Sequence, residues 1–177
     1  MIDSRLEPEA LPVAAWQILH EVDVARLVVQ HTALRNLCVE LETCANHLPD
    51  PDAVVGAARV SAALIDTLRR HESLEDAMMT SLGDADPAGL ASRMWARIRH
   101  RRAADRLHAE DLHDALTGGV EAVGPVRFDT LSYMMRCLFD GCLRGIDLEE
   151  AAMLLLAPGR LTAAARATLI ASLSCER

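Results

Sequence analysis

The sequence predicts an all-α protein, an antiparallel four-helix bundle followed by a short C-terminal fifth helix. The first observation is composition: of 177 residues, 51% are hydrophobic but only 3% are aromatic. Leu and Ala dominate, which favours helices, because strands draw on β-branched and aromatic residues. The second observation is spacing. Proline and glycine clusters divide the chain into segments of about 25 to 35 residues, which suits long helices joined by short turns.

Four clusters of proline, glycine and aspartate mark the expected helix boundaries. They lie at residues 48–52, 83–87, 118–125 and 158–159. A shorter helix at about 161–174 closes the chain. The length fits one domain over residues 1–177, with the bundle core at about 13–157.

The net charge, the apolar segments and the cysteines of the chain limit the kinds of function that it can have. The net charge of −8 argues against nucleic acid as a partner, since phosphate binding requires a basic surface. The five arginines between residues 97 and 106 point in several directions around their helix and predict a solvated face. No apolar run approaches the roughly 18 residues of a membrane span, and the start Met1-Ile2-Asp3 does not resemble a secretory signal, so we expect a cytoplasmic protein. Five cysteines without a CxxC pair predict reduced, buried thiols.

Three segments carry hydrophobic residues at alternating spacings of three and four, as expected for helices with one buried face. These stripes run from His20 to Leu48, from Ser61 to Leu82 and from Phe128 to Leu156. The segment between the second and third stripes is less regular. Its predicted inner face consists of Leu90, Met94, Ile98, Ala104, His108, Leu112 and Ala115.

Imidazole and carboxylate side chains interrupt these apolar stripes. Glu75 and Glu149 occupy predicted buried positions, where a carboxylate is costly unless it is paired, hydrogen-bonded or bound to a cation. His71 precedes Glu75 by four residues, so both leave one helix face. His31 and His108 lie near the middle of two other helices. Each residue alone also fits a hydrogen-bonded core position, but their joint placement favours a metal site.

Three stretches of the sequence resemble a known family. Residues 31–37 (HTALRNL), 68–76 (LRRHESLED) and 144–150 (RGIDLEE) resemble the repeated helix pairs of hemerythrin-like cation-binding (HHE) domains. The resemblance covers about residues 15–175. It implies the four-helix bundle of that family and a non-haem di-iron centre, held by a histidine and an HxxxE motif from each helix pair. Position by position, the implied metal ligands are His31, His71, Glu75, His108 and Glu149.

One position departs from the family pattern. Where the resemblance implies a histidine on the fourth helix, this chain has Gly145. A glycine removes a side chain from the interior, so a mononuclear iron site, a di-iron site and the loss of the metal all remain open. Cys142, one turn earlier, is either a substitute ligand or an inert buried thiol, and we favour the thiol.

The leading functional hypothesis is a metal-binding protein that uses non-haem iron to sense oxygen, nitric oxide or redox state, or that handles iron. Open coordination positions for a small diatomic ligand suit this role. The alternative is a metal-free bundle that has lost the ion and acts through a protein partner or a homodimer. In that case the apolar face of the fifth helix either packs back on the bundle or pairs two chains; it consists of Leu161, Ala165, Leu169 and Leu173.

Two further hypotheses have less support. A carboxylate-bridged di-iron oxidase or peroxidase requires more inward carboxylates than the stripes contain. A histidine phosphotransfer bundle requires an exposed histidine, whereas His31 and His71 lie on apolar stripes. The sequence therefore favours a binding protein over an enzyme.

Overall fold

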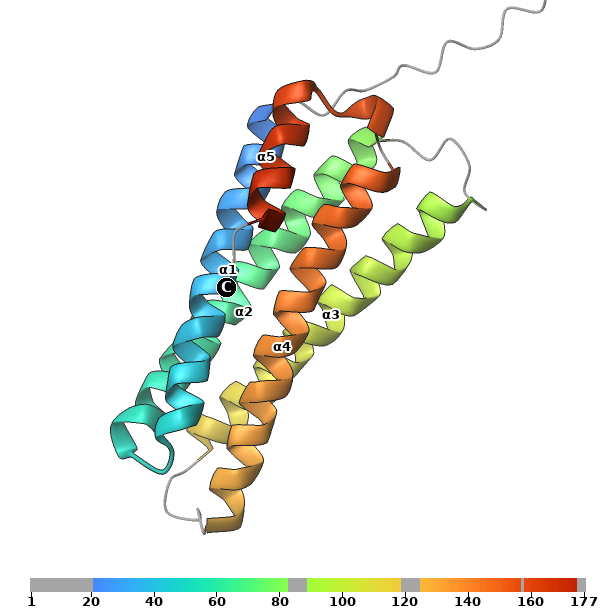
Figure 1. The fold of residues 1–177 in the computed structure, drawn as a ribbon. Helices are drawn as coiled ribbons and strands as arrows, with labels where there is room; N and C mark the ends of the chain where they lie inside the picture. Colours follow the sequence, from blue (N-terminus) through green and yellow to red (C-terminus); the bar gives the residue numbers. More distant parts are fainter. Residues whose placement is uncertain (1–20, 83–88, 119–124, 157, 175–177) are drawn as a thin grey trace, which may run out of the picture.

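The computed structural model describes residues 21–82, 89–118, 125–156 and 158–174. In this part of the chain the helices are α1 (Glu21–His47), α2 (Pro51–Leu82), α3 (Leu90–Thr117), α4 (Pro125–Leu156), the 3-10 turn η2 (Pro158–Arg160) and α5 (Ala163–Ser174). The four long helices form an antiparallel bundle in which α1 packs on α2 and α4, and α3 packs on the same two helices (Figure 1). This confirms the predicted fold class. His20 and the expected start of the core at residue 13 lie outside the described residues.

Local sequence explains where the helices begin and end. Pro51 opens α2, where its fixed φ suits the first helical position, and the Asp50 carboxylate accepts a hydrogen bond from the Asp52 backbone N–H at 3.0 Å. Thr162 caps α5 in the same way, since its hydroxyl accepts from the Ala165 N–H at 3.1 Å. At the end of α3, the Gly118 N–H donates to the Asp114 carbonyl at 2.9 Å. Turn residues read from the sequence thus set these boundaries.

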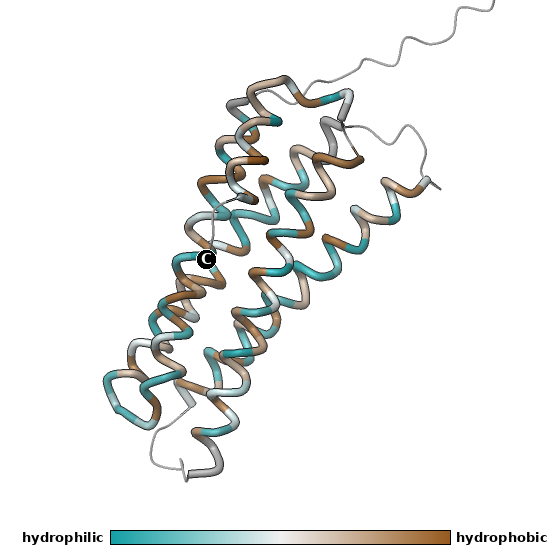
Figure 2. The backbone as a smooth tube through the Cα atoms, viewed as in Figure 1, coloured by the Kyte–Doolittle hydropathy of each residue, from teal (hydrophilic) through white to brown (hydrophobic). Residues whose placement is uncertain are grey.

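Hydrophobic and hydrophilic residues alternate along every helix, so that each helix has a buried and an exposed face (Figure 2). The buried faces build two separate apolar clusters. The turn-side core lies toward the α1–α2 turn and includes Leu34, Leu41, Leu64, Leu68, Leu112 and Leu138. The α5-side core lies toward η2 and α5 and includes Val24, Leu27, Met78, Trp95, Met153 and Leu169.

The predicted inner face of α3 is wrong in register over most of its length. The buried residues of α3 are Trp95, Ile98, Arg102, Asp105, Ala109, Leu112 and Leu116. Only Ile98 and Leu112 were among the residues expected there. The true face keeps the alternating three and four spacing throughout, but it passes through an arginine and an aspartate. Two charged residues therefore face inward from α3, and His108 is exposed.

Helix α5 packs back on the bundle beside α1 and the end of α4 (Figure 1). Leu161, Ala165 and Leu169 are buried in the α5-side core, whereas Leu173 at the end of the same face is 36% exposed. Among the described residues, no helix combines the length and the apolarity that crossing a membrane requires.

Candidate metal centre

Seven buried polar residues separate the turn-side core from the α5-side core. We call them the polar cluster; they are His31 from α1, His71 and Glu75 from α2, Arg102 and Asp105 from α3, and Glu149 and Glu150 from α4. On each long helix the apolar residues before and after the polar ones belong to different cores. The packed helices therefore hold the cluster at one depth inside the bundle, shielded from water on both sides.

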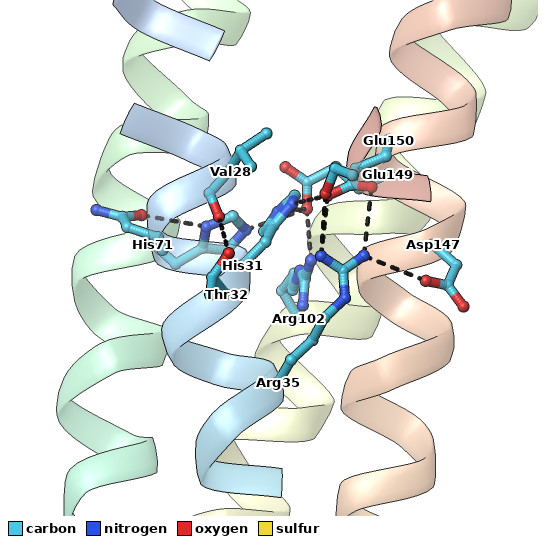
Figure 3. Close-up of polar contacts among 11 residues, drawn as sticks. Val28, His31, Thr32, Arg35, His71, Arg102, Asp147, Glu149 and Glu150 are labelled. Atoms are coloured by element: carbon cyan, nitrogen blue, oxygen red, sulfur yellow. Dashed lines mark hydrogen bonds and ion pairs between the residues drawn. The ribbon is translucent and has the colours of Figure 1, made fainter. Parts of the chain in front are cut away.

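His31, His71 and Glu149 form the centre of this cluster (Figure 3). One ligand atom from each lies within 4.8 Å of the other two. His71 Nε2 is 3.0 Å from Glu149 Oε2, and His31 Nε2 is 3.4 Å from the same oxygen. The two imidazole rings have their centroids 5.0 Å apart. Three residues from three helices thus converge on one small volume.

His31 lies between two carboxylates. Its Nδ1 is 2.6 Å from Glu150 Oε1, while its Nε2 faces Glu149 without hydrogen-bond geometry. Burial disfavours the imidazolium, but the two carboxylates outweigh burial and raise the pKa of His31. A neutral imidazole has only one N–H, so two facing acceptors call for a second proton or for a cation at Nε2.

His71 is placed in a similar way, but its Nδ1 faces an uncharged amide oxygen and not a carboxylate. Its Nδ1 is 3.2 Å from Gln30 Oε1, and its Nε2 faces Glu149. Burial dominates here and lowers the pKa of His71. Both histidines therefore direct Nε2 at Glu149 and use Nδ1 for an acceptor on the far side, which is how metal-binding histidines are commonly held.

Glu75 lies one turn beyond His71 on α2 and is 3% exposed. Burial, with the nearby Glu149 charge as the next cause, raises the pKa of Glu75 to about 7. Its Oε1 has no hydrogen-bond partner. A buried carboxylate oxygen without a partner is costly, so Glu75 has a strong tendency to take a proton or a cation.

Arg102 enters the cluster from α3 and is 1% exposed. Its Nη2 donates to Glu149 Oε2 at 2.5 Å, the oxygen that the two histidines also face (Figure 3). Burial alone would raise the pKa of Glu149, but Arg102 and the histidines outweigh it and hold that pKa well below its usual range. Glu149 is therefore an anion at neutral pH, balanced by an internal guanidinium.

A second hydrogen-bond network connects the cluster to α5. Glu150 Oε1, which contacts His31, also accepts from the Ser172 hydroxyl at 2.8 Å. Arg35 bridges this network, because its Nη1 donates to Ser172 at 3.1 Å and its Nη2 donates to Glu150 Oε2 at 3.3 Å. Arg35 Nη2 also reaches Asp147 at 3.4 Å. The last helix thus helps to fix the carboxylate that orients His31.

Replacing Ser172 with alanine removes two hydrogen bonds of this network. We expect the free energy of unfolding to fall by about 1 kcal/mol, because Glu150 keeps its His31 and Arg35 partners and loses one neutral donor. Urea denaturation at neutral pH measures the loss. Ser174→Ala is the control, since its hydroxyl bonds only to the Ile170 carbonyl within α5. Equal effects of the two substitutions would show that the link from α5 to Glu150 contributes nothing.

The other predicted ligands differ in their placement. His108 is exposed on α3, and the structure does not bring it to the polar cluster. Over this part of α3 the buried face is shifted by one residue from the predicted face. His108 is therefore exposed, and Arg102 and Asp105 are buried. Cys142 is buried beside Cys38; contact with that thiol, and then burial, raises the pKa of Cys142 well above its usual range. A thiol held protonated suits the inert role that we favoured.

Chemically, His31, His71 and Glu149 fit one divalent cation. Metal–nitrogen and metal–oxygen bonds of about 2.0 to 2.2 Å place neighbouring ligand atoms about 3 to 3.5 Å apart. The separations of 3.0 and 3.4 Å at Glu149 Oε2 lie in that range. Within this group, the unpartnered Nε2 of His31 is an atom that an ion would satisfy. Glu75 Oε1 is also unpartnered, but Glu75 is not among the three residues whose ligand atoms lie within 4.8 Å of one another.

A cavity of about 170 Å³ opens between α2 and α3 at the edge of the cluster. Glu75 and Arg102 are among its lining residues, together with Glu72, Asp76, Arg99, Ala103 and Arg106. Charged residues of both signs line it, so it admits water and small polar molecules. The cavity therefore connects the outside of the bundle to the Glu75 side of the candidate centre.

Sequence reasoning missed three members of the polar cluster: Arg102, Asp105 and Glu150. Arg102 was interpreted as part of a solvated arginine-rich face. The signal that could have found it is the unbroken spacing from Trp95 to Leu116, which passes through Arg102 and Asp105. Glu150 directly follows Glu149 and so falls outside the single predicted stripe of α4. It is buried because α1, α3 and α5 all pack against α4.

Comparison with known proteins agrees with this geometry. The family model described as hemerythrin HHE cation-binding domain matches residues 22–157. Comparisons with curated proteins and with solved structures give no match. The matched region contains all four long helices except Glu21, the first residue of α1, and it contains every member of the polar cluster. The chain therefore belongs to the hemerythrin HHE cation-binding domain family.

Proposed function

We propose that the protein binds one divalent transition-metal ion, iron(II) first among them, inside the bundle and uses it as a sensor of oxygen, nitric oxide or redox state. His31, His71 and Glu149 are the proposed ligands, and Glu75 is a fourth ligand that approaches from α2. His108, which was among the implied ligands, is left out because it is exposed. An iron-handling role uses the same residues.

One observation carries this proposal. Among the described residues, all the buried side-chain nitrogen and oxygen atoms without a hydrogen-bond partner belong to the polar cluster. They are His31 Nε2, Glu75 Oε1, Arg102 Nε, Arg102 Nη1 and Asp105 Oδ2. Buried polar atoms in folded proteins are nearly always satisfied. Two of these atoms, His31 Nε2 and Glu75 Oε1, can accept a cation, and they support the proposed site, whereas the two Arg102 atoms are donors. The donor set of two imidazoles and carboxylates suits iron, manganese and zinc.

The residues around the ligands support sensing more than catalysis. Two histidines and one carboxylate leave coordination positions open, and bound iron would supply an electron and a position for a diatomic ligand. Glu150 and Gln30 contact the Nδ1 atoms of His31 and His71 and so fix the orientation of the two imidazole rings. The cavity beside Glu75 gives a small molecule access to the centre, while the two apolar cores exclude bulk water from it.

The test measures cation-dependent stability. Chelator-treated protein is mixed anaerobically with iron(II), and separately with Mn(II) or Zn(II), and melted. At a free ion concentration of about 100 times Kd, binding stabilises the protein by about 2.7 kcal/mol, or about 5 to 10 °C at this chain length. His31→Ala and His71→Ala should lose this shift. His108→Ala is the matched control and should keep it, since that imidazole is exposed.

Two results bear on the proposal in opposite directions. A shift that vanishes in both inner-histidine variants and persists in the control supports it, and a change in the visible spectrum when nitric oxide is added to the iron(II) form supports the sensing role. No shift with any of the three ions overturns the proposed metal site.

A metal-free interaction protein is the second candidate, and Arg102 favours it. The guanidinium neutralises Glu149 at 2.5 Å without any ion. A bundle balanced in this way folds without metal and can act through its surface. The melting experiment separates the two candidates, because a metal-free bundle keeps one melting temperature with and without chelator.

A further inference from the structure

The guanidinium of Arg102 lies among the carboxylates of the polar cluster. Its Nη2 contacts Glu149 Oε2 at 2.5 Å, the oxygen that the two histidines also face. The side chain is 1% exposed, and its charge is permanent at any physiological pH. Burial alone would lower the pKa of Arg102, but the charges of its anionic neighbours Glu149 and Glu75 raise it. Asp105 Oδ2 lies near the same point of α4 as the guanidinium. Arg102 is thus an internal cation among the carboxylates of the polar cluster.

Gly145 on α4 makes the room for this guanidinium. A Cβ at residue 145 would lie 3.4 Å from Arg102 Nη1, 3.7 Å from Arg102 Cζ and 3.5 Å from Asp105 Oδ2. These are ordinary contact distances, so a single methyl group fits. Anything longer on this Cβ meets the guanidinium. A histidine ring at residue 145 and the Arg102 guanidinium therefore compete for one volume.

The remaining residues of the polar cluster offer a second ion carboxylates but no further imidazole. Gly145 has no side chain, and His108 is exposed. Glu75 and Glu149 are the carboxylates that a second ion would share with the first. A divalent cation placed between Glu75 and Glu149 would lie close to the Arg102 guanidinium, and the two positive charges would repel each other. The geometry disfavours a second ion in this chain.

We propose that Arg102 replaces the second cation of a two-metal centre and that Gly145 permits it, so that the bundle holds one metal ion. This inference rests on the proposed function, because it concerns the number of ions that the same cluster takes. Arg102 is then a residue that sets metal stoichiometry, and it balances the charge of Glu149.

The experiment counts Zn(II) or Mn(II) per chain by native mass spectrometry after chelator treatment and reloading. The wild type should bind one ion. The double variant Arg102→Ala/Gly145→His should bind two, because the new imidazole replaces the guanidinium beside Glu149 and Glu75. Gly145→Ala is the matched control and should bind one ion, since its methyl group fits without moving Arg102. Circular dichroism establishes that each variant is folded.

The outcomes separate this inference from the proposed function. One ion in both the wild type and the folded double variant overturns the inference and leaves the metal site standing. Two ions in the wild type also overturn it. No ion in the wild type overturns the proposed function itself. Should the double variant not fold, electron paramagnetic resonance of the wild type with excess Mn(II) decides: the signal of an isolated ion supports the inference, and an exchange-coupled pair overturns it.

Discussion

Replacing Arg102 with methionine is expected to destabilise the cation-free protein by about 3 kcal/mol, the lower part of the range for breaking a buried ion pair. Methionine keeps much of the volume but removes the charge that balances Glu149, and a buried carboxylate without its partner is costly. We expect the loss of unfolding free energy to lie near the lower end of this range because His31 and His71 still face Glu149. Chemical denaturation of chelator-treated protein measures the change.

The matched control for this substitution is Arg97→Met. Arg97 lies on the same helix but is exposed, so its replacement should change the free energy of unfolding by less than about 0.5 kcal/mol. Added divalent cation should restore more stability to Arg102→Met than it adds to the wild type, because the ion then supplies the missing positive charge. A loss below about 1 kcal/mol in Arg102→Met would mean that the guanidinium does not hold Glu149 in solution.

Glu149→Gln is expected to have two effects, a loss of about 3 to 5 kcal/mol of stability and a loss of the cation-dependent melting shift. The stability falls because the buried Arg102 guanidinium loses the carboxylate that it contacts at 2.5 Å. Binding is expected to fail because Glu149 is the proposed oxygen ligand, and its Oε2 faces both histidines. Denaturation and melting of the same sample measure both effects. Glu40→Gln, at an exposed ion pair with Arg59, is the control and should cost less than about 1 kcal/mol.

A double-mutant cycle tests whether these two losses share one origin. The Arg102→Met/Glu149→Gln variant removes both charges, so its destabilisation should fall well short of the sum of the single losses. Additive losses would instead show that the two side chains are stabilised independently of each other.

The bundle itself could be predicted from the sequence because three of its helices follow a simple physical rule. In α1, α2 and α4 the buried positions are mostly apolar, so the alternating spacing is visible in the residue types. Four polar residues in these stripes, His31, His71, Glu75 and Glu149, stood out against that background and are buried in the structure. These four could therefore be singled out without coordinates, whereas Glu150, the residue after Glu149, could not.

The part of the site contributed by α3 could not be predicted in the same way. Arg102 is one of five arginines within ten residues, and a pattern of residue types cannot tell a buried arginine from its exposed neighbours. What buries Arg102 is its partner on another helix, Glu149, together with the space at Gly145. Both depend on how α3 and α4 pack, which is a tertiary property. The resemblance to the family further favoured His108, and the helix rotates that residue outward.

The hydrogen bond from Ser172 to Glu150 places one of the contacts that support the candidate metal centre outside the family match. The segment recognised by the family model stops at residue 157, whereas the support of the first imidazole reaches through Glu150 into the final helix. A chain shortened to residues 22–157 would keep every proposed ligand. It would lack Ser172, so the Glu150 carboxylate that contacts His31 would lose that hydrogen bond and the cover of α5. We therefore expect the affinity of the proposed site for a cation to depend on α5, a helix that contributes no ligand.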